Sequence, residues 1–265
     1  MPFVPAYPGI YHQKAAEKFA AFFRNRPGVE AILLVNSCAR GKASPDSCLD
    51  LAVLLTPQAF KQTRTVFEND WEAFYRAEAV FADLEKSGLY SNIEPHFCDG
   101  SFTQPEHGWT SGPDDFELEI GNLLAYSFPL WQGSDRLDRL KREWLPYYPE
   151  SLRAERLKMV RNFCLNNLNH IEPFARRGLY FQCFNRFYNA FREFLQALFI
   201  AQRVYPIAYD KWIREQIVEI LGMPDLYEML PHLFEIQHFE SLEIVEKARI
   251  LRGLVEEYTT LDSLF

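Results

Sequence analysis

Two apolar runs joined by a short polar turn constrain the fold of this chain more than any other feature. The runs lie within residues 29–37, "VEAILLVNS", and 47–56, "SCLDLAVLLT". Short apolar runs rich in Val, Leu and Ile, bounded by turn residues, predict buried strands. A third strand is predicted at 89–100. Helical spacing predicts a helix over 11–26 and helical structure over 57–86.

The character of the sequence changes near residue 150. Segment 116–126 predicts a helix and 128–131 a short strand, whereas 151–265 shows almost no strand signal and four or five long amphipathic segments. We therefore predict an α+β protein with two domains. Residues 1–149 form a mixed sheet with helices, and residues 150–265 form an all-helical bundle.

Composition limits the function and the setting. The 265 residues are 48% apolar and carry a net charge of −8, which argues against a nucleic-acid partner because phosphate backbones require clustered Lys and Arg. No stretch approaches roughly 18 uncharged apolar residues, so no membrane partner is expected. The start lacks a signal-peptide pattern, and the five Cys lack Cys-x-x-Cys spacing. We expect a cytoplasmic protein; its oligomeric state stays open, with a homodimer as one option.

A carboxylate inside the second apolar run is the first sign of a site. Strand side chains alternate between faces, so Cys48 and Asp50 are expected to point to the same side. Ser37 and the turn residues before this strand supply a hydroxyl and backbone amides. Amides and a small hydroxyl suit phosphate oxygens, and acids suit a divalent cation. The pattern predicts a site for a triphosphate with a metal ion.

This stretch resembles the signature of the DNA polymerase β-like nucleotidyltransferase superfamily, which is Gly-Ser, about ten residues, then Asp-x-Asp on a strand. The matching residues are Ser37, the turn Ala39-Arg40-Gly41, Ser47 and Asp50. The whole chain, with its helical segment 177–213, resembles the antibiotic nucleotidyltransferase branch. That branch includes lincosamide- and aminoglycoside-modifying enzymes and uncharacterised bacterial relatives.

The resemblance implies roles for particular residues. Ser37 would contact the nucleotide phosphates, aided by the backbone near Asn36 and by Arg40. Asp50 matches the second metal-binding acid for Mg²⁺. The third acid belongs on a later strand, where Glu94 is the first candidate and Asp99 the second. The implied reaction transfers a nucleoside monophosphate from a nucleoside triphosphate to a hydroxyl of a small molecule.

Two departures from the family pattern leave an alternative open. Asn36 stands where the family has Gly, and Cys48 stands where the first metal acid belongs. A thiol is a poor ligand for Mg²⁺. The alternative is therefore a catalytically impaired member that binds nucleotide or a partner without chemistry. A less favoured alternative is a zinc site, because His96 and Cys98 would share the face of Cys48 and Asp50 if Glu94 does.

The second domain is expected to supply the acceptor contacts. Glu193 is the candidate general base, among polar residues that interrupt the aromatic run 181–199. The Phe residues of that run are expected to form the bundle core. Lys211 is either an anchor at a helix start or a cation that reaches nucleotide phosphate.

Overall fold

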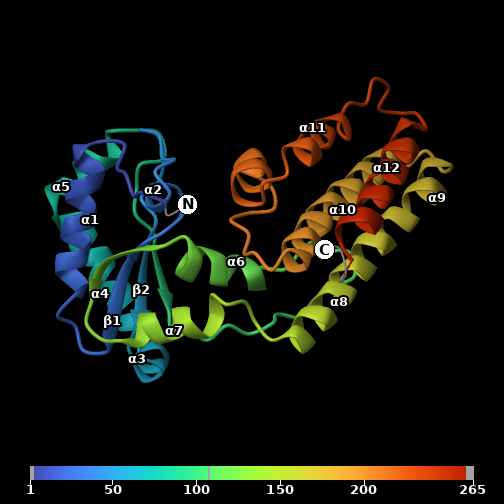
Figure 1. Cartoon of the computed structure of the whole chain (residues 1–265). Coiled ribbons are helices and arrows are strands. Elements are labelled where there is room, and N and C mark those ends of the chain that lie inside the picture. The colour runs from blue at the N-terminus through green and yellow to red at the C-terminus, as the bar shows by residue number, and fades with distance from the viewer. Residues whose placement is uncertain (1–2, 107, 261–265) are drawn as a thin grey trace. The chain divides into compact units, whose positions relative to one another are not determined.

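The computed structural model describes residues 3–106 and 108–260. It divides into two compact units, drawn in Figure 1. We call Met1–Thr103 with Glu119–Pro146 the mixed unit, and Gln104–Leu118 with Tyr147–Phe265 the helical unit. The boundary between the predicted domains was placed where the sequence pattern changes, whereas the two units are defined by which residues pack together. The two descriptions differ mainly at Gln104–Leu118.

The mixed unit is built on a four-stranded sheet with the order β3-β2-β1-β4. Strand β1 is antiparallel to both β2 and β4, while β2 is parallel to β3, so the predicted mixed sheet is confirmed. All five residues of β2 are buried, as expected for a central strand with an uninterrupted apolar run. The strands are β1 (Val29–Leu34), β2 (Leu51–Leu55), β3 (Pro95–Cys98) and β4 (Phe128–Gln132).

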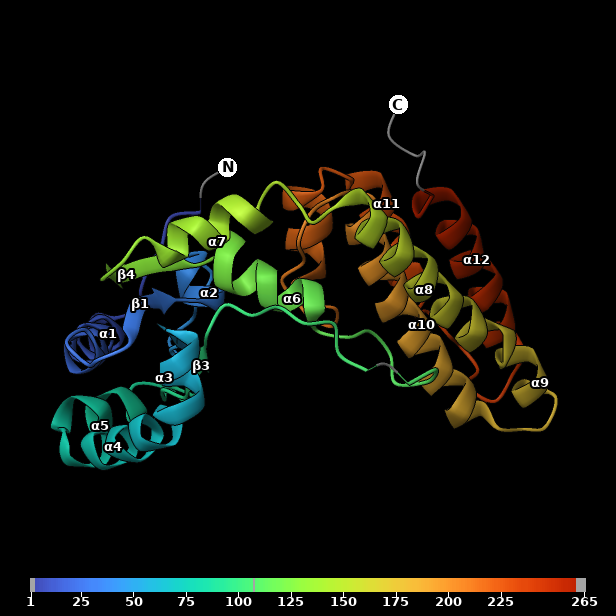
Figure 2. The same ribbon diagram turned by 90° about the horizontal axis from the view of Figure 1, so that it is seen from below.

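Helices cover both faces of this sheet. Figure 2 shows α7 on the opposite side of the strands from α4 and α5. The predicted helical stretch 57–86 is divided in three. Thr56 caps the start of α3 by accepting the Ala59 amide, α3 ends at Thr63, and the extended backbone of Glu78 separates α4 from α5. The helices are α1 (Ile10–Phe23), α2 (Asn36–Ala39), α3 (Pro57–Gln62), α4 (Arg64–Ala77), α5 (Ala79–Glu85) and α7 (Arg136–Trp144).

The helical unit packs α8 along α10, with α12 against both, as Figure 1 shows. Its core takes Phe187, Phe191, Phe194 and Phe199 from α10. Phe181 is instead 79% exposed and contacts the Phe239 ring, so the expectation that the whole aromatic run is core was wrong at this end. The elements are α8 (Glu150–Asn169), α9 (Ile171–Ala175), α10 (Tyr180–Ala201), η2 (Glu215–Ile220), α11 (Pro224–His232) and α12 (Glu243–Tyr258).

The stretch between β3 and β4 includes α6 (Phe116–Ile120) and the π-helical turn η1 (Gly121–Ala125). The sequence predicts one helix here, and the structure has these two segments in its place. Across residues 3–106 and 108–260, no helix combines the length and the apolar character needed to cross a membrane.

A fully buried ion network fixes Gln104–Leu118 to the helical unit. The Arg156 guanidinium donates from Nε to Glu117 Oε1 and from Nη2 to Glu117 Oε2, both at 2.7 Å. Nη2 also donates to Asp114 Oδ1 at 2.7 Å. Tyr148 and Gln196 donate to the same Glu117 carboxylate. Burial opposes the charge on Arg156, but these carboxylates outweigh it and raise the Arg156 pKa, so the guanidinium stays charged.

Removing the cation should therefore unfold the helical unit more easily. Arg156→Met leaves two carboxylates buried without their partner, and should lower the free energy of unfolding by about 3–5 kcal/mol. Urea unfolding followed by circular dichroism at the helical signal measures this. The control is Arg203→Gln, which removes an exposed partner of Glu150 and should cost less than about 1 kcal/mol. Equal losses in the two variants would contradict the role of the network.

Candidate functional site

The register of β1 and β2 brings the turn and the acid to one edge of the sheet. Leu34, the last residue of β1, pairs with Leu51, the first residue of β2. One step further, the Val35 amide donates to the Asp50 carbonyl at 3.1 Å. Helix α2 begins at Asn36, the next residue, so the start of this helix lies close to Asp50.

Strand β3 brings a second carboxylate to the same edge. Leu51 pairs with Pro95 in the parallel ladder, so Asp50 and Glu94 each stand one residue before this pair. Phe97, Leu51 and Val53 lie in the core under α1 and α4, and alternation puts Asp50 and Glu94 on the opposite face. Glu94 is exposed. Asp99, the second candidate, follows the other end of β3 and accepts the Ser101 amide there.

Asn36 has a backbone conformation that Gly adopts more readily than other residues. Its φ is +55°, in the left-handed region that Gly adopts freely and that Asn tolerates better than most residues. Ser37 and Arg40 follow it and are buried, with 8% and 3% exposure. The turn therefore has a conformation that a glycine would also allow, and it carries the amide side chain of Asn36.

Cys48 engages the acid that would hold the metal. Leu49 is buried in the core, so Cys48 and Asp50 share the other face, and the Cys48 thiol donates to Asp50 Oδ1 at 3.2 Å. Cys38 in α2 is close by: burial first, and then Asp50 and Cys48, raise the pKa of the Cys38 thiol to about 12. Cys38 is a neighbour that sequence reasoning missed, and its place in the turn motif was the only signal.

The loop before Cys48 is held by contacts outside the site. Asp46 Oδ1 accepts the Leu89 amide at 3.0 Å, and Ser91 donates to the Pro45 carbonyl at 2.7 Å. The buried His12 ring hydrogen-bonds the Ser47 carbonyl at 3.2 Å. Asp46 thus anchors the loop, and Cys48 is positioned by its neighbours on both sides.

The acids do not form a three-ligand metal centre. In the described part of the chain, no three His, Cys, Asp or Glu side chains come together in a way that could hold a metal ion. The zinc alternative, built on Cys48, Asp50, His96 and Cys98, is therefore not supported.

A cavity of about 350 Å³ lies further along β3. His96, Cys98 and Arg64 are among its lining residues, and so is Asp99, the second candidate for the third acid. Ser37, Cys48, Asp50 and Glu94 do not line it. Burial is the main reason that the pKa of Cys98 is raised to about 12, so this thiol is neutral. The cavity is thus separate from the edge formed by Ser37 and Asp50.

The two site residues predicted in the helical unit have different surroundings. Glu193 is completely buried, and Asn167 donates to its Oε2 at 2.8 Å. The role of Glu193 as general base stays a prediction, and its side chain does not reach solvent in this structure. Lys211 is exposed in the loop between α10 and η2, where its carbonyl accepts the Gln216 side chain at 3.1 Å.

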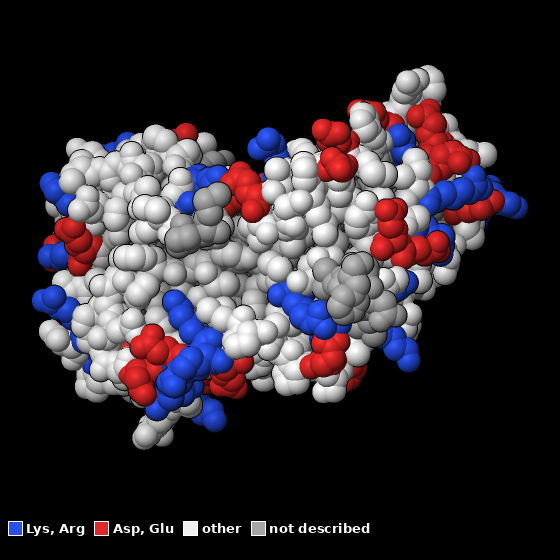
Figure 3. All heavy atoms as spheres, viewed as in Figure 1, with Lys and Arg blue, Asp and Glu red and all other residues white. Residues whose placement is uncertain are grey.

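Charge is mixed on the face of the molecule drawn in Figure 3. Lys and Arg lie there among Asp and Glu, and the basic side chains do not form one continuous stripe on this face.

Comparisons with known proteins show a distant likeness to a solved structure. No protein-family model matches the chain, and no curated protein matches it. Among solved structures, the chain is similar to a nucleotidyltransferase-like protein from Exiguobacterium sibiricum 255-15. The identity is 14%, the match covers 94% of this chain and 75% of that one, and the TM-score is 0.46.

The positive φ at Asn36 can be tested by substitution. Asn36→Gly should keep or slightly raise the melting temperature, because Gly adopts this conformation without strain. Asn36→Val should lower the free energy of unfolding by about 1–2 kcal/mol, since a β-branched residue is strained there. Thermal unfolding of both variants measures the difference, and an Asn36→Val variant as stable as wild type would rule out this backbone conformation.

Glu193 should make stability depend on pH. Burial is the main reason that the pKa of Glu193 is raised from 4.5 to about 8. The folded state then holds the proton more tightly than the unfolded state, so stability falls as pH rises from about 4.5 to about 8. The slope for one proton is at most about 1.4 kcal/mol per pH unit.

Glu193→Gln, a neutral replacement of the same shape, should remove the part of the pH dependence of stability that comes from Glu193. Urea unfolding at several pH values gives the difference between the two proteins. Parallel pH profiles would contradict a raised Glu193 pKa.

Proposed function

We propose that the protein binds a nucleoside triphosphate with Mg²⁺ at the edge where Ser37 and Asp50 meet, in the manner of a nucleotidyltransferase-type domain. The observation that carries this proposal is the strand register, which brings the turn after β1 beside the start of β2. The turn supplies a hydroxyl and a buried arginine, Arg40, for phosphate oxygens. The carboxylate of Asp50, at the same edge of the sheet, would hold the metal ion.

A metal that arrives with the nucleotide fits this donor set better than a resident metal. Mg²⁺ commonly takes one or two carboxylates together with substrate phosphates and water. Asp50 offers one carboxylate, and Glu94 stands beside it in register. When bound, the ion would neutralise phosphate charge.

Binding without efficient transfer is the function that the geometry favours. A nucleotidyltransferase places a carboxylate where this chain has Cys48, and that thiol occupies Asp50 Oδ1 by donating a hydrogen bond to it. The neutral thiol adds no charge and no hard ligand for Mg²⁺. The buried Glu193 also leaves the general base unassigned.

Transfer to a small-molecule acceptor is the second candidate, and the adjacent positions of Asp50 and Glu94 favour it. In that reaction an acceptor hydroxyl oxygen bonds to the α-phosphorus as the bond to the β-phosphate oxygen breaks. Pyrophosphate leaves, and the hydroxyl proton passes to a base. The acceptors of the antibiotic-modifying branch, which are small polyhydroxylated or amino-sugar molecules, belong to this candidate.

Nucleotide binding should stabilise the native state. ATP, GTP, CTP or UTP at millimolar concentration with Mg²⁺ should raise the melting temperature, and a ligand at about 100 times its Kd contributes about 2.7 kcal/mol. Asp50→Asn should remove the part of the shift that depends on Mg²⁺, while Asp46→Asn, at the loop anchor, should leave it unchanged. An unaltered melting curve with all four nucleotides would defeat the proposal.

Replacing the thiol should separate the two candidates. Cys48→Asp supplies a hard oxygen ligand and should tighten Mg²⁺-dependent nucleotide binding, with Cys48→Ser as the control that changes only the thiol. If the wild-type protein only binds nucleotide, then incubating it with a nucleotide labelled at the α-phosphate and a small-molecule acceptor gives no labelled acceptor. Labelled product from wild type at ordinary enzyme rates would establish the transferase instead.

A further inference from the structure

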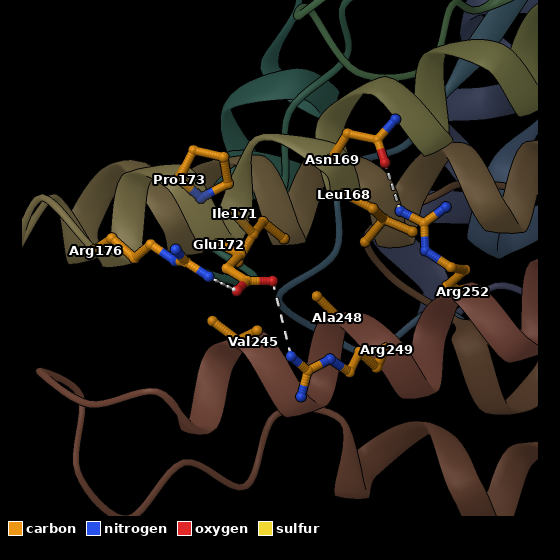
Figure 4. A pocket seen from close by; sticks show the side chains of 10 residues that line it. All are labelled: Leu168, Asn169, Ile171, Glu172, Pro173, Arg176, Val245, Ala248, Arg249 and Arg252. Carbon is orange, nitrogen blue, oxygen red and sulfur yellow. Dashed lines mark hydrogen bonds and ion pairs between the residues drawn. The ribbon is translucent and has the colours of Figure 1, made fainter.

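A groove in the helical unit has the properties of a second ligand site. It lies between the end of α8 with α9 on one side and α12 on the other, and its volume is about 560 Å³ (Figure 4). This volume is in the range of small-molecule sites. The groove is formed entirely within the helical unit, so it is separate from the edge formed by Ser37 and Asp50.

The floor of the groove is apolar and its walls are cationic. Leu168, Ile171, Val245 and Ala248 form the floor and belong to the core of the unit. Three arginines, Arg176, Arg249 and Arg252, stand around it, against one lining carboxylate, Glu172. In a chain with a net charge of −8, this is a local concentration of positive charge.

The single carboxylate is shared between two of these arginines. Glu172 accepts from Arg176 at 2.6 Å and lies 3.7 Å from Arg249, which also pairs with Glu246. The hydrogen bond from Arg176, followed by its charge, lowers the pKa of Glu172, so this group is ionised.

Arg252 has a different partner. Its Nη2 donates to the neutral Asn169 side chain at 2.7 Å, across the groove as Figure 4 shows. Its charge is therefore not neutralised by this contact. A guanidinium has five N–H donors in a planar fork that matches phosphate oxygens.

We propose that this groove binds a small organic phosphate monoester. The phosphate lies between Arg249 and Arg252, and the apolar body of the ligand covers Val245 and Ala248. A dianion suits the two arginines, and the apolar lining between them favours a ligand with a ring over an ion alone. This site is independent of the proposed nucleotide function.

Phenyl phosphate is the test ligand, titrated calorimetrically into the full-length protein at low salt without Mg²⁺. Arg252→Gln and Arg249→Gln should each weaken binding about tenfold, the loss expected for a charge-assisted hydrogen bond. Arg203→Gln, in the same unit but outside the groove, should bind like wild type. Asp50→Asn should also bind like wild type, which separates this site from the nucleotide edge.

Two further ligands test the chemistry. Inorganic phosphate lacks the ring and should bind at least about tenfold more weakly than phenyl phosphate, while benzyl alcohol lacks the charge and should not bind. The proposal is overturned if phenyl phosphate gives no heat of binding at millimolar concentration. It is also overturned if Arg203→Gln weakens binding as much as Arg252→Gln, or if the two phosphates bind equally.

Discussion

The register of β2 between its two neighbours is the constraint on which the candidate site depends. Because β1 runs antiparallel and β3 parallel to β2, the end of β1 and the starts of β2 and β3 meet at one edge. The apolar residues Leu49, Leu51 and Val53 face the core and thereby turn Asp50 to the other side. A slip of one residue would reverse these faces and bury the acid in the core.

Within that frame, the two departures from the nucleotidyltransferase pattern have different consequences. Asn36 is a change that the backbone tolerates, since it keeps the left-handed conformation of the turn. Cys48 changes the chemistry, because a thiol hydrogen-bonded to Asp50 stands in place of a metal-binding carboxylate. Under the proposed function, the thiol at Cys48 would weaken transfer, while the turn at Asn36 and Ser37 would still receive phosphate.

The sequence predicted the parts of the fold that depend on local pattern. Apolar runs located the strands, and alternation placed Cys48 and Asp50 on one face, which their hydrogen bond confirms. The features that the local sequence does not indicate depend on tertiary contacts. Nothing local indicates that Asp114 and Glu117 pair with Arg156, which lies about forty residues further along the chain and draws the segment into the helical unit. The burial of Glu193 likewise depends on how α8 packs on α10.

The central claim is that a triphosphate binds at the edge where Ser37 and Asp50 meet. A crystal structure of the protein with a non-hydrolysable ATP analogue and Mn²⁺, with anomalous diffraction to locate the metal, tests it most directly. We expect phosphate density beside Ser37 and an anomalous peak within coordination distance of Asp50. Ordered nucleotide elsewhere, or a metal peak that does not contact Asp50, would contradict the account.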